Sequence, residues 1–318
     1  MRKFMKICRK SEMELKGWLE KLLKAKYKEV VNEDGFLYAR GNAPILLTAH
    51  MDTVHKEKCK EIVVEKLDGE TILSSPQGIG GDDRCGVWII RQILTKTKYR
   101  PYVLFCEQEE VGGVGSEKFT RTDYVDELKE MKYLIELDRA NYNDAVYYDC
   151  GNEDFMGYIE EMIGYKEAHG SFSDISNLSP KCDVASVNLS CGYYRAHTLN
   201  EYVIFEEMFD TYKAVKKLLA NAKDCERFDY QEKTYSRWDY NDWYSGNYFK
   251  SQFTESETDY TTLFDTDSVY EILYEDVDGE EKSCIIDANS YAEAIGYFLM
   301  ENGNLTFNSV LDWFECAS

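Results

Sequence analysis

Proline is scarce in this sequence, and its cysteines form no Cys-x-x-Cys pair. Only four prolines occur among 318 residues, and no Gly/Ser-rich linker is present. The ten cysteines are scattered, and some, such as Cys106 and Cys191, lie in apolar runs where a free cysteine behaves as a small hydrophobic residue. A disulfide framework is not expected in a chain of this size. The sequence therefore predicts reduced cysteines and a cytoplasmic protein.

Long apolar runs and positive charge are also lacking. No run of 18 apolar residues occurs, and the basic N-terminus has no continuous apolar stretch of the kind found in signal peptides. The net charge of −22 argues against nucleic acid and anionic membranes as partners. A glycine-rich loop at 78–86 lacks the Gly-Lys-Ser/Thr ending of a phosphate loop, and its two carboxylates would repel phosphate.

Acidic residues are concentrated toward the C-terminus. Residues 223–318 contain 6 Lys/Arg and 22 Asp/Glu, a net charge of −16, whereas residues 1–222 contain 31 and 37, a net charge of −6. We predict a large domain at 1–222, an acidic, aromatic-rich linker or strap at 223–268, and a small ββαβ-like unit at 269–318. In that unit the pattern indicates a hairpin around Asp278-Gly279 and a helix at 291–301.

Strands and helices alternate in the large domain, which predicts an α/β fold. Short apolar runs between turn residues predict buried strands at 44–49, 102–106, 133–137 and 185–191. Amphipathic patterns predict helices at 10–26, 85–95 and 206–222. Weaker alternation predicts further strands at 145–149 and 156–163.

Metal-capable side chains follow several of the apolar strands. Five of them lie at or shortly after a strand end: His50, Asp82, Glu110, Asp138 and His197. In open α/β sheets this is the edge where ligands bind. Two imidazoles and three carboxylates satisfy two zinc ions if one carboxylate bridges them, and each ion keeps a position for water. A single carboxylate in so acidic a chain is more often a solvated charge, but five in this arrangement favour a two-metal site.

The motifs that contain these residues resemble those of the co-catalytic di-zinc exopeptidases. Five motifs occur in the family's order, over roughly residues 35–222: His50-x-Asp52, Gly81-Asp82-Asp83-Arg84-x-Gly86, Gln108-Glu109-Glu110-x-Gly112, Leu137-Asp138 and Arg195-Ala196-His197. That family includes tripeptidase T, carboxypeptidase G, succinyl-diaminopimelate desuccinylase and the tetrahedral aminopeptidases. The resemblance implies a three-layer α/β/α fold with a central mixed, mostly parallel sheet. It also implies hydrolysis of an amide bond next to a peptide terminus.

The resemblance further implies which residues bind the two metal ions. His50 and Asp138 would bind one zinc ion, Glu110 and His197 would bind the other, and Asp82 would bridge both. The mixed nitrogen and oxygen ligands also suit Co²⁺ or Mn²⁺. Relatives insert a domain either between the equivalents of His50 and Asp82 or between those of Asp138 and His197. Here only 31 and 58 residues intervene, so the chain resembles the catalytic core with its extra piece at the C-terminus.

Further roles follow from the same resemblance. Asp52 would orient His50, and Glu109 would be the general base that takes a proton from the bridging water and returns it to the leaving amine. A cis peptide between Asp82 and its neighbour is expected, as in relatives. His55 is expected to be a loop residue rather than a ligand. Arg84 is expected to be structural, in an ion pair with a nearby carboxylate.

The substrate side is less clearly marked. The loop that contains His169 and Asp174 resembles a substrate-side loop in relatives, and Arg195 either meets a substrate carboxylate or fixes the loop of His197. Asp rather than Glu at 138 is the choice of relatives with aminopeptidase or tripeptidase activity, which favours an aminopeptidase. Alternatives are a dipeptidase, a carboxypeptidase, an N-acyl-amino-acid deacylase, or a noncatalytic interaction protein on this fold. The expected partners are a peptide or N-acyl amino acid substrate, and a protein partner or second copy at the C-terminal region.

Overall fold

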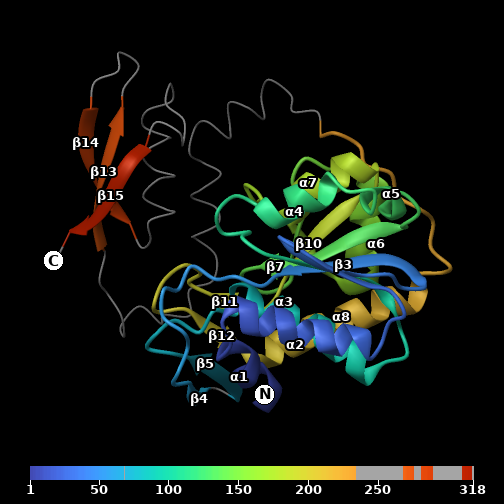
Figure 1. Ribbon diagram of the computed structural model, residues 1–318, viewed down its shortest axis with the longest axis horizontal. Helices are drawn as coiled ribbons and strands as arrows, with labels where there is room; N and C mark the ends of the chain where they lie inside the picture. Colours follow the sequence, from blue (N-terminus) through green and yellow to red (C-terminus); the bar gives the residue numbers. More distant parts are fainter. Residues whose placement is uncertain (68, 234–267, 276–280, 289–309, 317–318) are drawn as a thin grey trace. The chain divides into compact units, whose positions relative to one another are not determined.

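The computed structural model describes residues 1–67, 69–233, 268–275, 281–288 and 310–316. The chain divides into two compact units, Met1–Lys233 and Thr234–Ser318. The first unit contains all of the residues that the sequence marks as functional. Figure 1 shows its central sheet with helices on both faces, which is the three-layer α/β/α arrangement.

The central sheet of the first unit has eight strands. Their order across the sheet is β1 (Val30–Glu33), β2 (Phe36–Ala39), β6 (Pro101–Cys106), β3 (Ala43–His50), β7 (Tyr133–Arg139), β10 (Ser186–Ser190), β8 (Asp144–Val146) and β9 (Lys166–Ala168). Strands β6, β3, β7 and β10 are parallel neighbours, and β8 and β9 are also parallel. The remaining pairs are antiparallel, so the sheet is mixed and mostly parallel.

Each face of the sheet is covered by its own set of helices. One face carries α1 (Arg2–Cys8), α2 (Glu12–Lys24), α3 (Gly81–Lys96), α6 (Glu153–Ile163) and α8 (Phe205–Asn221). The other carries α4 (Val114–Thr120), α5 (Val125–Leu128) and α7 (Asp174–Cys182). Successive strand residues alternate between the two hydrophobic cores, so Leu47 packs with the first set and Leu46 with the second. Both faces of the sheet are therefore buried, as continuous apolar strands predict.

Local sequence explains where the helices begin and how closely they pack. Helix α2 starts at a capping box, in which the side chains of Ser11 and Glu14 each accept a backbone N–H of the other residue. Helix α3 lies directly against β7, because a Cβ atom at Gly86 would be 1.9 Å from the carbonyl oxygen of Leu137. Only glycine permits this approach, which brings the start of α3 close to the end of β7.

One predicted strand is a helix. The weak alternation at 156–163 falls in α6, where Phe155 and Ile159 are four residues apart and buried on one face. The Asn152 side chain accepts a hydrogen bond from the Phe155 N–H and caps the helix, while Gly164 ends it in a left-handed conformation. The helical spacing and both capping residues were present in the sequence. The strand prediction was wrong because it relied on the weak alternation of apolar and polar residues instead.

A second sheet of the first unit carries the loop that contains His197. It has four antiparallel strands in the order β11 (Tyr193–Tyr194), β12 (Tyr202–Ile204), β5 (Glu70–Ser74) and β4 (Val63–Leu67). The loop between β11 and β12 holds His197, and the backbone of this residue has a positive φ of 65°. The sheet thus fixes both ends of a short, sharply turned loop.

The predicted segment 223–268 begins in contact with the first unit. The Phe228 carbonyl accepts the Ala185 N–H at 2.9 Å, and the Gln231 carbonyl accepts the Gly151 N–H at 2.7 Å. Residues 234–267 of this segment lie outside the described residues. In the second unit, β13 (Ser268–Glu275) pairs antiparallel with β14 (Glu281–Ala288) and with β15 (Val310–Cys316).

The pairing of β13 with β14 has the register of the predicted hairpin, since Glu275 is opposite Glu281. The predicted helix at 291–301 lies outside the described residues. Among the helices that the structure describes, none is long and apolar enough to cross a membrane.

Candidate metal centre

Three of the five candidate ligands come together at the carboxyl ends of three neighbouring parallel strands. His50 is the last residue of β3, Asp138 lies next to the end of β7, and Glu110 follows β6 by four residues. Because β6, β3 and β7 are adjacent in the sheet, their ends share one edge. The position of each side chain therefore follows from the lengths of the strands that precede it.

Asp82 occupies the centre of the cluster. The chain reaches it through Gly80, which is in the left-handed conformation with φ 65° and ψ 45°, and the peptide between Asp82 and Asp83 is cis. One carboxylate oxygen of Asp82, Oδ1, is 2.9 Å from Nε2 of His50, and the other, Oδ2, is 3.1 Å from Nε2 of His197. A single carboxylate thus faces two imidazoles with different oxygens.

Each imidazole has a second carboxylate beside it. Asp138 Oδ1 is 3.2 Å from His50 Nε2, and Glu110 Oε2 is 3.1 Å from His197 Nε2. The ligand atoms of His50, Asp82 and Glu110 lie within 4.8 Å of one another. His50, Asp138 and Glu109 form a second such group. The donors are imidazole nitrogens and carboxylate oxygens, which suit Zn²⁺, Co²⁺ and Mn²⁺.

The charges of the cluster also fit cation binding. Burial and the repulsion of neighbouring carboxylates raise the pKa of Glu109 to about 9 and that of Asp138 to about 7. Glu110 Oε1 is buried and has no hydrogen-bond partner among the described residues. Burial alone would raise the pKa of Asp82 too, but hydrogen bonds from His197 and His50 hold it well below its usual range. Carboxylates crowded in this way are stabilised as anions by bound cations.

Asp52 joins two parts of the site. Its Oδ1 lies 3.3 Å from Nδ1 of His50. The same carboxylate accepts the backbone N–H groups of Glu109 at 3.1 Å and of Glu110 at 3.2 Å. It therefore lies beside the imidazole and also fixes the loop that carries both glutamates. The second function was not predicted, because backbone contacts of this kind leave no motif.

Glu201 is a positioning residue that the sequence reasoning missed. It is fully buried, and its carboxylate accepts the N–H of Gly80 at 2.8 Å and the N–H of Asp82 at 2.9 Å. Its Oε2 also lies 2.9 Å from Nε2 of His55. His55 is thus a loop residue that contacts Glu201 and lies outside the group of candidate metal ligands. Glu201 lies four residues after His197, and nothing in its local sequence indicated the contact.

Two more residues hold Asp138 in place. The Ser173 hydroxyl donates to Asp138 Oδ2 at 2.8 Å, and the Asn188 side-chain carbonyl accepts the Asp138 N–H at 2.9 Å. Ser173 belongs to the loop that was expected to face the substrate, and it instead supports a candidate ligand. The signal in the sequence was the loop's position before α7, which does not specify the direction of the hydroxyl.

The three predicted substrate residues have different surroundings. His169 is exposed in the loop after β9, at the edge of the sheet, and partial desolvation of its ring, together with the positive charge of the nearby Lys233, lowers its pKa. Arg195 is exposed, and its carbonyl accepts the Thr198 hydroxyl at 2.8 Å inside the loop of His197. Asp174 is 0% exposed, so the interior encloses its carboxylate, and we assign it no contact with substrate.

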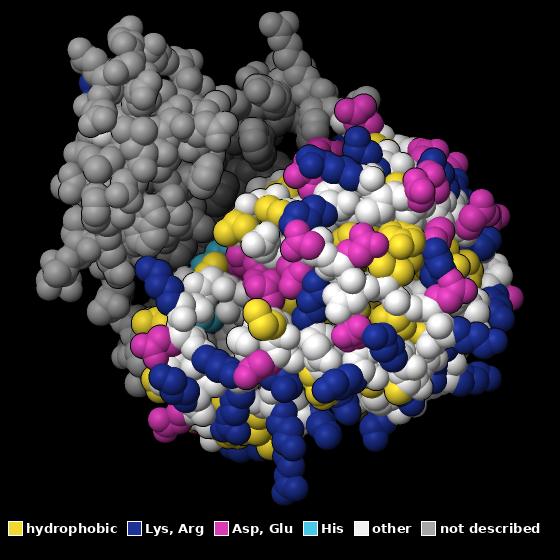
Figure 2. Space-filling view, in the orientation of Figure 1, with side chains coloured by type: hydrophobic (Ala, Val, Ile, Leu, Met, Phe, Trp, Pro, Cys, Tyr) yellow, Lys and Arg dark blue, Asp and Glu magenta, His cyan; other side chains and the backbone are white. Residues whose placement is uncertain are grey.

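Figure 2 shows acidic side chains gathered on the visible face of the first unit, with histidine atoms close by. Lysine and arginine are spread over much of the surrounding surface in this view. In the candidate metal site, the Glu110 and Asp82 side chains are 9% and 11% exposed, whereas the His197 side chain is 35% exposed. A ligand can therefore reach the cluster from the side of His197.

Known structures resemble this chain in fold. Aminopeptidase PepT from Bacillus cereus superposes with a TM-score of 0.54 at 17% identity, over 70% of this chain and 97% of that one. A tripeptidase from Staphylococcus aureus gives 0.56 at 12% identity, over 70% and 97%. The TET1 peptidase from Pyrococcus horikoshii gives 0.50 at 15% identity, over 69% and 97%. No protein-family profile and no curated protein matches the sequence.

These similarities define the class of fold. The first unit has the α/β architecture of the aminopeptidase and tripeptidase structures, with a large mixed, mostly parallel central sheet. The resemblance in fold that the sequence motifs implied is confirmed. Identities below 20% establish architecture, whereas activity must be argued from the residues of the site.

Proposed function

We propose that this chain is a two-metal exopeptidase that removes residues from the amino terminus of peptides. The observation that carries the proposal is the position of Asp82, whose two oxygens each face a different imidazole. Asp138 and Glu110 provide one further carboxylate to each half. His50 and Asp138 would bind one ion, Glu110 and His197 the other, and Asp82 both. Bound ions would polarise a scissile carbonyl and acidify a water molecule.

Glu109 is the proposed general base. It is partly exposed beside the cluster, and no imidazole of the described residues lies within ion-pairing distance of it. Burial raises the pKa of its carboxyl group to about 9, and bound cations would lower that pKa and leave the carboxylate free to take up a proton. Glu109 would take a proton from the attacking water at a carboxylate oxygen and pass it to the nitrogen of the leaving amine. Asp52 holds the Glu109 backbone during this transfer.

Zn²⁺ is the proposed metal, with Co²⁺ and Mn²⁺ as alternatives that the same ligands accept. The preference for the amino terminus rests on Asp138, and on the structural neighbours that are named as aminopeptidases or tripeptidases. A dipeptidase, a carboxypeptidase and an N-acyl-amino-acid deacylase use the same chemistry on other ends of the substrate. They differ from an aminopeptidase in whether a free α-amine is required.

A digest of a mixed peptide pool tests the proposal. The zinc-loaded chain is incubated with free peptides and with N-acetylated copies, and products are read by mass spectrometry. We expect loss of single N-terminal residues from free peptides only. Glu109→Gln should lower the rate by about 10²- to 10⁴-fold while both metal ions stay bound. The matched control is Glu107→Gln in the same loop, whose native carboxylate pairs with Lys16 at 2.6 Å.

Other outcomes would replace the proposal. Cleavage of acetylated peptides at the C-terminus, or release of the acetyl group, would establish one of the alternative amide hydrolases. Absence of any cleavage from a chain with two bound ions would favour a noncatalytic interaction protein. Full activity of Glu109→Gln would remove Glu109 from the mechanism.

A second copy of this chain is the proposed partner of the C-terminal region. The TET1 peptidase from Pyrococcus horikoshii, whose structure resembles this chain, is described as assembling into a tetrahedron or a large octahedral shell. Residues 223–318 are strongly acidic, so association through them should strengthen as salt screens their charge. Sedimentation velocity of the chain at low and high salt tests this, and a monomer at every concentration would contradict it.

A further inference from the structure

Large apolar side chains are exposed on the segments that hold the candidate metal ligands. Four of them lie within two positions of a residue of the site in the sequence: Val54, Val111, Phe172 and Leu199. Their exposed fractions are 40%, 69%, 40% and 64% in that order. In Figure 2, hydrophobic side chains border the gathered acidic ones. One exposed hydrophobic residue is ordinary, but several around one site are typical of a ligand-binding surface.

Phe172 is held against the loop that carries Glu109. A Cβ atom at Gly113 would be only 2.6 Å from Cζ of Phe172, so the ring lies directly on the backbone of that glycine. The Gly113 N–H donates to the Glu109 carbonyl at 2.9 Å, which places the ring beside the turn that starts at the proposed general base. The next residue, Ser173, is buried and donates to Asp138. The ring is therefore fixed between two parts of the site while 40% of the residue stays open to solvent.

Val111 lies in the turn on which the Phe172 ring rests. The Glu109 carbonyl accepts the N–H groups of both Gly112 and Gly113 at 2.9 Å, so the chain turns sharply over these residues. Val111 directly follows the candidate ligand Glu110 and is 69% exposed. Val111 and Phe172 therefore lie where the loop of the two glutamates meets the loop before α7.

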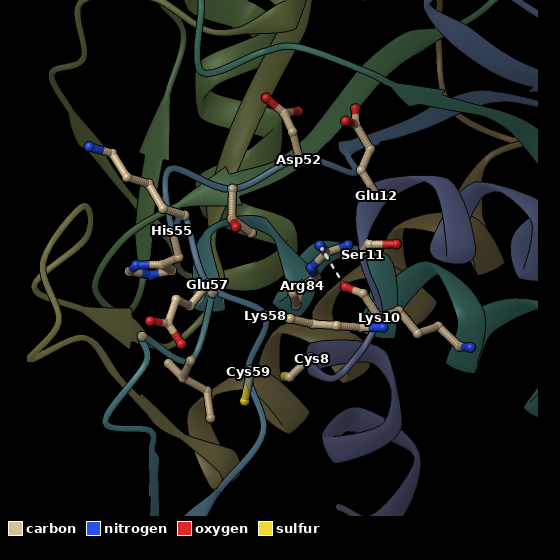
Figure 3. Close-up of a pocket in the computed structure, with 15 residues that line it drawn as sticks. Cys8, Lys10, Ser11, Glu12, Asp52, His55, Glu57, Lys58, Cys59 and Arg84 are labelled. Carbon is tan, nitrogen blue, oxygen red and sulfur yellow. Dashed lines mark hydrogen bonds between the residues drawn. The ribbon is translucent and has the colours of Figure 1, made fainter.

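The nearby Arg84 is closed to a substrate side chain. It is 4% exposed, and its Nη2 donates to the carbonyl of Lys10 at 3.3 Å (Figure 3). No carboxylate of the described residues lies within ion-pairing distance of it, although the charges of Asp52 and Glu12 act on it, so the expected ion pair is not formed. Of the two arginines in the sequence motifs, only Arg195 is exposed.

A cavity that shares Asp52 with the site is lined by charged side chains and by none of the four apolar residues (Figure 3). Its volume is about 230 Å³. Every residue of 52–59 lines it except Val54, whose exposed side chain therefore points elsewhere. The charged cavity and the apolar side chains are thus different surfaces, and Val111 connects the second to the candidate ligand Glu110.

We infer that the proposed peptidase selects peptides with a large apolar side chain next to the bond it cuts, and that Phe172 and Val111 contact this side chain. The inference rests on the proposed function, since it names the class of peptide that the metal centre would act on. An apolar side chain that covers the two residues removes apolar surface of both molecules from water, which favours binding. An acidic side chain would instead need Arg195.

Peptide binding to the zinc-loaded Glu109→Gln chain tests the inference, because this variant should bind peptides without cutting them. Isothermal titration calorimetry compares Leu, Ala, Asp and Lys at the first position of X-Gly-Gly and at the second position of Gly-X-Gly. In at least one series we expect the Leu peptide to bind about tenfold or more tightly than the Asp and Lys peptides. Tighter binding of the Asp or Lys peptides, equal affinities, or no binding of any peptide would overturn the inference.

Variants of the apolar residues give the second arm of the test. Phe172→Ala should weaken binding of the Leu peptide about fivefold or more and change that of the Ala peptide by less than about twofold. Phe209→Ala on α8 is the matched control, because Phe209 is also 40% exposed, and it should bind both peptides as its parent does. Equal losses for the two peptides would mean that Phe172 only supports Ser173, and would overturn the inference.

Val111→Ala makes the same comparison at a more exposed position. It replaces Phe172→Ala if circular dichroism shows that the latter does not fold. We expect a loss of about threefold for the Leu peptide and less than about twofold for the Ala peptide. Unchanged binding of the Leu peptide in every folded variant would remove the two residues from the contact.

The two proposals can fail separately. A native chain that cuts peptides at equal rates whatever their side chains would keep the proposed function and lose the inference. A native chain that cuts no peptide, but whose binding favours Leu and depends on Phe172, would lose the proposed function and keep an apolar peptide-binding surface.

Discussion

The two halves of the candidate metal site differ in how deeply they are buried. The side chain of His50 is 0% exposed, whereas that of His197 is 35% exposed. His50 ends a central strand, and Asp138 beside it is held by Ser173 and Asn188. His197 instead lies in a loop between two short strands of the smaller sheet. One half is thus part of the hydrophobic core, and the other is reached from solvent.

The site needs both a fixed geometry and access from solvent, and the two halves provide these properties separately. A buried half with strand-borne ligands keeps its geometry without a bound ion, because the sheet fixes it. An open half on a loop would give the proposed metal ions and substrate a path to the site, and binding residues are commonly found on loops. Asp82 connects the halves, because each of its two oxygens faces one of the two imidazoles.

Loss of Asp82 should affect both halves at once. Asp82→Ala removes the carboxylate that faces both imidazoles, so we expect bound zinc to fall from two ions per chain to below one. Activity should fall more than about 10³-fold, since bound metal contributes several kcal/mol of transition-state stabilisation. Mass spectrometric metal analysis and peptide hydrolysis measure the two effects. Asp126→Ala on the surface of α5 is the control, and retention of two ions by Asp82→Ala would refute the bridging position.

The two histidines should have unequal effects on stability. In chelator, His50→Ala should lower the free energy of unfolding by about 3 kcal/mol, because it leaves buried carboxylates without their partner. His197→Ala should cost about 1 kcal/mol or less, since its contacts are partly solvated. Urea unfolding followed by fluorescence gives both values. Equal losses would mean that the exposed loop is as integral to the core as the central strand.

Removal of the Glu201 carboxylate should weaken metal binding, although Glu201 is not itself a candidate ligand. Glu201→Gln loses a charge that accepts the N–H groups of Gly80 and Asp82, and we expect zinc affinity to fall about 10- to 100-fold. Competition with a coloured chelator measures the affinity. The control is Glu206→Gln, which alters contacts with Thr71 instead. A larger loss in the control than in Glu201→Gln would contradict the positioning role of Glu201.

The smallest expected effect is on how the stability of the chain depends on pH. It concerns Glu207, whose carboxylate contacts Tyr194 in the strand before the His197 loop. Burial raises the pKa of Glu207 to about 7, although its carboxylate accepts the Tyr194 hydroxyl at 2.7 Å. The unfolded value is about 4.3, so the folded chain binds this proton more tightly. Stability is therefore full below about pH 4.3 and decreases as pH rises toward 7.

Glu207→Gln should remove that decrease. The variant should gain stability relative to the native chain as pH rises from about 4 to 7, by about 1 kcal/mol or less because the group is partly exposed. Urea unfolding at several pH values measures the difference. A gap that does not change with pH would show that Glu207 ionises as freely when folded as when unfolded.

Strands and their ends were predictable because both depend on local pattern. A short apolar run ending in His50, and another followed by Asp138, placed these side chains at one edge of the sheet before any contact was known. The α6 prediction failed where two periods competed, and the helical period of Phe155 and Ile159 prevailed because it buries both side chains.

Contacts between distant segments were not predictable in the same way. Glu201 accepts N–H groups more than a hundred residues away, and Ser173 supports Asp138 across 35 positions. Such bonds use backbone groups or common side chains, which carry no spacing rule. For Arg84, charge alone suggested an ion pair, and no carboxylate of the described residues lies within ion-pairing distance of it, although the charges of Asp52 and Glu12 act on it.

The origin of the ligands along the chain has a consequence for how the protein matures. The cluster draws on segments from residue 50 to residue 197, and they meet only when β3, β6 and β7 have paired and the smaller sheet has formed. A site of this kind does not exist in the unfolded chain. In the proposed peptidase, metal uptake would follow the assembly of the first unit, and a nascent chain that is released early or misfolded would remain unloaded and inactive.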